Sequence, residues 1–136
     1  MLANNYRNVL ENIRLTCERC KRDPAEVTLI SVSKTKPLED LKEVYAAGSR
    51  DFGENKVQEM SVKAPCMPED ITWHMIGHLQ TNKVKNVIKY AGLIHSVDSL
   101  HPAEEIEKQA AKVQKTVDIL IEVNMANEAS KFGLFD

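Results

Sequence analysis

The stretch VTLISVSKTKP, residues 27–37, joins an apolar, β-branched run to a polar segment that holds two lysines and ends at a proline. An apolar run of this kind is typical of a strand that is buried on both faces. The residues after the proline take helical spacing, and Gly48 is a plausible stop signal for that helix. The stretch therefore predicts a strand over 27–33 followed by a helix over 38–47.

The same strand–helix unit recurs along the rest of the chain. The predicted strands begin near residues 27, 50, 71, 93 and 117, at intervals of 21 to 24 residues. A repeat of this period is typical of parallel strands joined by right-handed crossovers. The later strands are expected at 50–53, 71–76, 93–97 and 117–124, with helices at 54–63, 81–90 and 102–115.

The even spacing favours a (β/α) barrel over a doubly wound sheet, because no glycine-rich fingerprint follows the first strand. An amphipathic entry helix is expected over 2–21. Eight units after such a segment need roughly 210 residues, whereas the chain has 136. We therefore expect an α/β fold that holds the entry helix and the first five β/α units of a truncated TIM-type (β/α)8 barrel. No linker divides residues 1–136, so we expect one partial barrel domain.

Charge and composition exclude several classes of function. The chain has 18 Lys+Arg and 20 Asp+Glu, a net charge of −2, which argues against nucleic acid as the main partner. No apolar run approaches the roughly 20 residues that a membrane span needs. The polar N-terminal residues do not look like a signal peptide, so we expect a cytoplasmic protein. Three cysteines do not make a disulfide framework.

Functional groups of parallel barrels lie at the C-terminal ends of the strands. Lys34 is expected there after the first strand, and Asn55 and His78 follow the second and third strands. Partial desolvation and a nearby Lys36, on the same side if the strand continues, would both favour a neutral amine at Lys34. A neutral amine can attack an aldehyde and form a Schiff base. The alternative is a solvated charge at a strand end, which is common for lysine.

Two residue pairs have metal-like spacing, but we expect no metal site. Cys17 and Cys20 lie near the C-terminal end of the entry helix, where a thiolate is not favoured; we interpret them as core or half-buried thiols. His74 and His78 have the i, i+4 spacing of a helical zinc pair. Residues 73–76 read as a strand, however, so these two side chains would not share a helix face.

Five stretches fall at strand-to-loop positions. In chain order they are SVSKTKP (Ser31–Pro37), AGSRDFGENKVQE (Ala47–Glu59), WHMIGHLQTNK (Trp73–Lys83), IHSVDS (Ile94–Ser99) and NEASKFG (Asn127–Gly133). They resemble, in the same order, motifs of the pyridoxal 5′-phosphate (PLP) homeostasis proteins of the YggS/PROSC type. The fold of that family is similar to the N-terminal barrel of alanine racemase.

The resemblance implies that the chain binds PLP and that Lys34, the first lysine of SKTKP, carries the cofactor as a Schiff base. It also implies that Asn55 lines the cofactor pocket and that His78 lies near it. The family is regarded as a carrier or buffer in intracellular PLP homeostasis, so we expect PLP binding and no enzymatic turnover. The alternatives are an enzyme similar to PLP-dependent amino-acid racemases and a truncated fragment with no tight cofactor binding.

One departure from the family concerns the phosphate of the cofactor. In the family, loops after the late strands hold the phosphate, and an arginine from the same part faces the pyridine nitrogen; those segments are not in this sequence. Because oriented N–H groups normally make such a site tight, we expect residues 1–136 alone to bind PLP weakly. The first and fifth strands would also leave two sheet edges exposed, and these edges make self-association possible.

Overall fold

The computed structural model describes residues 1–126 and 133–134, and these residues build a single parallel sheet with helices packed on it. The strand order β1-β2-β3-β4-β5 follows the chain, and every neighbouring pair is parallel. A doubly wound sheet would reverse its strand order partway, so this order confirms the barrel-type fold. The strands are β1 (Ser31–Val32), β2 (Asp51–Glu54), β3 (Thr72–Met75), β4 (Ala91–Val97) and β5 (Asp118–Ile121).

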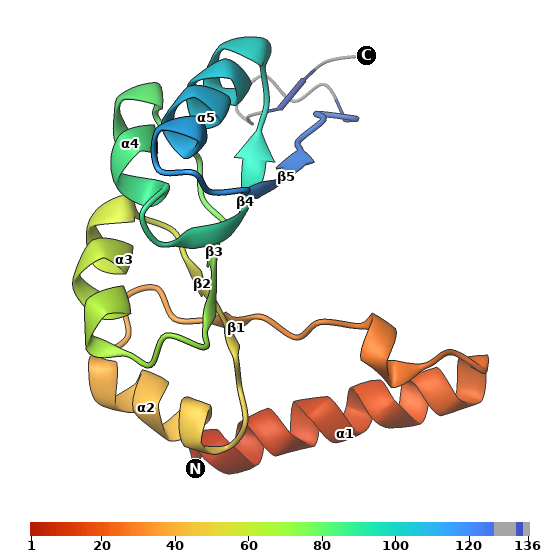
Figure 1. Ribbon diagram of the computed structural model, residues 1–136. Helices are drawn as coiled ribbons and strands as arrows, with labels where there is room; N and C mark the ends of the chain where they lie inside the picture. Colours follow the sequence, from red (N-terminus) through yellow and green to blue (C-terminus); the bar gives the residue numbers. More distant parts are fainter. Residues whose placement is uncertain (127–132, 135–136) are drawn as a thin grey trace.

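The helices after the strands all cover the same face of the sheet (Figure 1). They are α2 (Leu38–Ala46), α3 (Val57–Lys63), α4 (Val84–Val87) and α5 (Leu100–Lys112). The entry helix α1 (Leu2–Cys20) lies across the lower end of the molecule in this view and packs on α2. Three short 3-10 turns complete the described elements: η1 (Pro24–Glu26), η2 (Ala64–Cys66) and η3 (Thr81–Lys83).

The hydrophobic core lies between the sheet and α2–α5. Phe52, Trp73 and Met75 point to this side and are at most 4% exposed, and the rings of Phe52 and Trp73 are 5.7 Å apart between centroids. Side chains alternate along a strand, so Gly53 faces the other side. A Cβ at Gly53 would lie 3.1 Å from Ile30 Cγ2 and 3.2 Å from Ile76 Cδ1. We call this opposite side of the sheet the inner face.

Two local expectations were wrong. The strand expected over 27–33 is regular only over Ser31–Val32, and Lys34 and Thr35 then form a turn in which Thr35 has a φ of 62°. The strand therefore does not continue to Lys36, which instead lines a small cavity beside α1 and α2. The helix expected over 81–90 is the turn η3 followed by the four residues of α4.

Among the described residues, no further strand pairs with the outer edge of β1 or of β5, although the chain just beyond β5 forms an isolated bridge between Val123 and Leu134. On β5, Leu120 is 48% exposed and Ile121 is 65% exposed; on β1, Val32 is 53% exposed. The fifth sequence motif falls on residues 127–133, of which 127–132 lie outside the described residues. Within the described part of the chain, none of the helices has the length and apolarity that crossing a bilayer requires.

Candidate functional site at the carboxyl edge of the sheet

Lys34 lies directly after β1, at the carboxyl edge of the sheet. Val32 pairs with Gly53, and the Ser33 amide donates a 2.9 Å hydrogen bond to the Gly53 carbonyl, so the pairing with β2 continues to the residue before the lysine. The Lys34 side chain is exposed, and the described residues offer its amine no hydrogen bond or ion pair. The expected desolvation was wrong, because the strand stops before it can bury the lysine.

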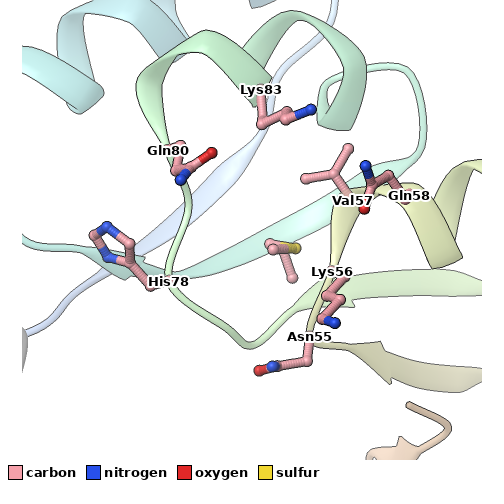
Figure 2. Close-up of a pocket in the computed structure, with 8 residues that line it drawn as sticks. Asn55, Lys56, Val57, Gln58, His78, Gln80 and Lys83 are labelled. Atoms are coloured by element: carbon pink, nitrogen blue, oxygen red, sulfur yellow. The ribbon is translucent and has the colours of Figure 1, made fainter. Parts of the chain in front are cut away.

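Asn55 and His78 line one cavity of about 280 Å³ between the ends of β2 and β3. Figure 2 shows both side chains projecting to the left of the view, from neighbouring strand ends. Lys34 is not among the residues that line this cavity. The structure thus brings two of the three expected residues together and places the third at the end of the adjacent strand. The remaining lining residues are Lys56, Val57, Gln58, Met75, Gln80 and Lys83.

The position of Asn55 depends on a glycine of the next loop. A Cβ at Gly77 would overlap both the side-chain oxygen and the carbonyl oxygen of Asn55. Only a residue without a side chain allows the two loops to approach this closely. His78, one residue later, is 36% exposed at its side chain, and its Nδ1 lies 3.9 Å from Asp98 Oδ2.

A buried charged network lies on the helix side of the same edge, and no sequence motif indicated it. Glu54 ends β2 with no exposed surface, and Lys63 Nζ lies 3.1 Å from its carboxylate. Burial raises the pKa of Glu54, while hydrogen bonds from Ser33 and Lys63 act in the opposite direction. Hydrogen bonds from Lys63 and from the Thr35 amide lower the pKa of Glu59 to about 2. The i, i+4 spacing of Glu59 and Lys63 was the one available signal.

A second polar chain crosses the sheet through His74. Its Nε2 lies 2.9 Å from Asp51 Oδ1, and its Nδ1 lies 3.0 Å from His95 Nε2. Burial, with the nearby His74, lowers the pKa of His95. Because His74 belongs to β3 and bonds across the sheet, it does not pair with His78 in the following loop. Among the described residues, no group of three or more His, Cys, Asp or Glu could hold a metal ion.

Known proteins match nearly the whole length of this chain. The family described as the N-terminal domain of alanine racemase matches residues 5–135. The pyridoxal phosphate homeostasis protein of Aquifex aeolicus is 44% identical over 93% of this chain and 56% of that protein. The protein of the same name from Pseudomonas aeruginosa is 38% identical over 97% of this chain and 58% of its own length. The chain thus spans a little more than half the length of these relatives.

Solved structures agree with the sequence comparisons. PipY of Synechococcus elongatus, with PLP bound, has a TM-score of 0.75 and 36% identity, covering 95% of this chain and 57% of that chain. Alanine racemase of Bartonella henselae has a TM-score of 0.63 at 19% identity, covering 95% and 35% respectively, which supports the fold alone. The chain therefore belongs to the alanine racemase N-terminal domain family and, within it, to the pyridoxal phosphate homeostasis proteins of the YggS/PROSC type.

Proposed function

We propose that the chain binds PLP through a Schiff base at Lys34 and serves intracellular PLP homeostasis without a turnover reaction. The observation that carries the proposal is the place of the Lys34 amine: it is exposed at the carboxyl edge of the sheet and has no partner in the described residues. A lysine that must capture a carbonyl needs an accessible nitrogen that no carboxylate holds in its charged form. The PLP-bound relative PipY supports the choice of cofactor.

The residues at this edge fit such a cofactor. When bound, PLP would supply an aldehyde, a group that a neutral amine can attack with loss of one water molecule. Lys34 supplies the amine once it has released a proton. Asn55, held against Gly77, offers an amide that can both donate and accept hydrogen bonds. His78 adds an imidazole at the rim of the same cavity as Asn55.

The absence of turnover is part of the proposal. A two-base racemase needs a second acid or base on the opposite face of the cofactor, commonly a tyrosine. The chain has three tyrosines; Tyr6 lies in α1 and Tyr45 in α2, while Tyr90 immediately precedes β4. The Tyr45 hydroxyl donates a 2.6 Å hydrogen bond to Asp70, which raises the pKa of the phenol. None of these three tyrosines lies at the carboxyl end of a strand, which is the edge of the sheet that carries the candidate site.

The test is the absorbance spectrum of the purified chain with PLP, before and after borohydride reduction. We expect an imine band that reduction removes, that is lost in Lys34→Ala and that is kept in Lys36→Ala, the matched control from the same motif. A band of unchanged intensity in Lys34→Ala would remove Lys34 from its role. Exchange of an amino-acid α-proton that requires both PLP and Lys34 would instead show an enzyme of the racemase type.

A further inference from the structure

Three charged side chains meet on the helix side of the turn that carries Lys34. Glu54 ends β2 and is completely buried, and Lys63, at the end of α3, is 9% exposed. Glu59 lies one helical turn before Lys63. The Lys63 ammonium lies 3.1 Å from both oxygens of Glu54 and 2.9 Å from Glu59 Oε2. We call these three residues the Glu54–Lys63–Glu59 network.

The network bonds to the residues on both sides of Lys34. Lys63 Nζ donates a 2.7 Å hydrogen bond to the carbonyl of Ser33. The Ser33 hydroxyl donates to Glu54 Oε2. On the other side, the Thr35 amide donates a 2.9 Å hydrogen bond to Glu59 Oε2. The backbone is therefore held immediately before and immediately after Lys34, while the Lys34 side chain is left out of the network.

The turn needs such a restraint. Thr35 has a φ of 62°, in the left-handed region that is unfavourable for a β-branched residue. A short chain segment with such a residue keeps its conformation only where its surroundings determine it. The hydrogen bonds that Ser33 and Thr35 make to the network hold this turn on both sides of Lys34.

A gain in folding stability does not by itself explain the Glu54–Lys63–Glu59 network. Burying a carboxylate and an ammonium carries a desolvation penalty that offsets most of their attraction, and apolar replacements are often no less stable. A fully bonded polar network does fix one geometry, and no buried side-chain polar atom among the described residues lacks a hydrogen-bond partner. The same bonds also keep the Lys63 amine from reacting with a carbonyl, because its protons are all directed at acceptors.

We infer that the Glu54–Lys63–Glu59 network is a positioning unit for Lys34, fixing the backbone from which the reactive amine extends and withholding the neighbouring Lys63 from the same reaction. The inference rests on the proposed function, since it concerns the lysine that would carry PLP. Glu59 is its most accessible member, with a side chain 27% exposed, so it can be changed with the least risk to folding.

The test compares Glu59→Ala with Glu59→Gln, because a glutamine oxygen can still accept from both the Thr35 amide and Lys63. Glu107→Ala, an exposed change of equal charge on α5, is the control. For Glu59→Ala we expect the PLP concentration that gives half-maximal labelling of Lys34 to rise about tenfold, the worth of one charge-assisted hydrogen bond. Without PLP, the Thr35 amide should exchange its hydrogen about tenfold faster. Glu59→Gln should restore most of both values.

The outcomes separate this inference from the proposed function. Labelling of Lys34 that is the same in Glu59→Ala and wild type overturns the inference and leaves the proposed function in place. Faster exchange at Thr35 with unchanged labelling also overturns it, because the network would then order the turn without affecting the lysine. Labelling of wild type at another lysine overturns the proposed function and this inference with it.

Discussion

The carboxyl edge of the sheet leaves no room for a further side chain beside Asn55. Gly77 is needed for contact rather than for backbone freedom, because any side chain there would overlap Asn55. In the proposed function, the amide of Asn55 can donate hydrogen bonds to the cofactor and accept them from it. A change at Gly77 is therefore expected to affect the proposed PLP site through Asn55, without removing any polar group.

Gly77→Ala should weaken PLP binding about tenfold, with a smaller loss of stability. The added methyl group must displace Asn55, and a side chain moved by about 1 Å loses most of an oriented hydrogen bond. Gly92→Ala is the matched control on the neighbouring strand, where the new Cβ would lie 3.0 Å from Cγ2 of Thr72, an exposed side chain. The measurement is a PLP titration of each variant by absorbance. Equal weakening by both substitutions would contradict a specific role for Asn55.

The lowered pKa of Glu59 predicts that the folded chain loses stability as the pH drops. Its pKa in the folded chain is about 2, below the ordinary value of 4.5, so the folded state favours the ionised carboxylate. The stabilising contribution is complete above about pH 4.5, and it falls as the pH drops toward 2. The thermal midpoint of wild type should exceed that of Glu59→Gln near pH 7, and the difference should shrink below pH 4.5. A difference that is constant from pH 7 to pH 3 would contradict this assignment.

At the scale of elements, the sequence predicted the strand–helix alternation because apolar periodicity is a local signal. The expected entry helix over 2–21 is α1, and the expected helix over 38–47 is α2 with its end at Ala46. The boundaries of β1 could not be predicted, because its length depends on pairing with β2 rather than on its own apolar residues. The turn at Thr35 is held by Glu59, which lies 24 positions later in the chain.

The candidate site was predictable only where a motif or a strand end marked it. Lys34, Asn55 and His78 each follow a strand, so local reasoning could place them at one edge. The partners of Glu54 could not be found in this way, because Lys63 belongs to a different element. Asp51 likewise has no partner close to it in the sequence, whereas the structure places its Oδ1 2.9 Å from Nε2 of His74 on the neighbouring strand.

The buried ion pair between Glu54 of β2 and Lys63 of α3 predicts that removing one partner lowers stability more than removing both. Lys63→Met leaves Glu54 buried without its counter-ion and should lower the free energy of unfolding by about 3–5 kcal/mol. Combining it with Glu54→Leu removes the buried charge and should restore much of that loss. Urea unfolding measures both effects. A double variant less stable than Lys63→Met would contradict the prediction, because removing the unpaired buried carboxyl group would then bring no gain in stability.

At the scale of the whole molecule, the open sheet determines what else the chain can contact. Within the part of the chain that the structure describes, β1 and β5 each pair with one neighbour only, whereas β2, β3 and β4 pair on both sides. Strand β5 also exposes its apolar side chains, and all four of its residues are exposed. Edges of this kind favour pairing with another chain, so we propose that the chain of 136 residues self-associates through β5.

Ile121→Lys should reduce this self-association. A lysine on an edge strand opposes pairing, because its charge would have to be desolvated at the interface. Val113→Lys, at a residue 56% exposed just after α5, is the control for added charge. Sedimentation velocity over a range of protein concentrations should show a concentration-dependent increase in mass for wild type and the control, and a smaller one for Ile121→Lys. The same increase in all three chains would place the contact elsewhere.

In the proposed function, the fold makes one lysine, Lys34, the carrier of PLP. The most direct test is to reduce the PLP complex with borohydride, digest it, and quantify the label on each lysine-containing peptide by mass spectrometry. At low PLP concentration we expect most of the label on Lys34, although many other lysines are also exposed. Label spread over the exposed lysines in proportion to their accessibility would overturn the assignment of Lys34, because Lys34 would then be one surface amine among many.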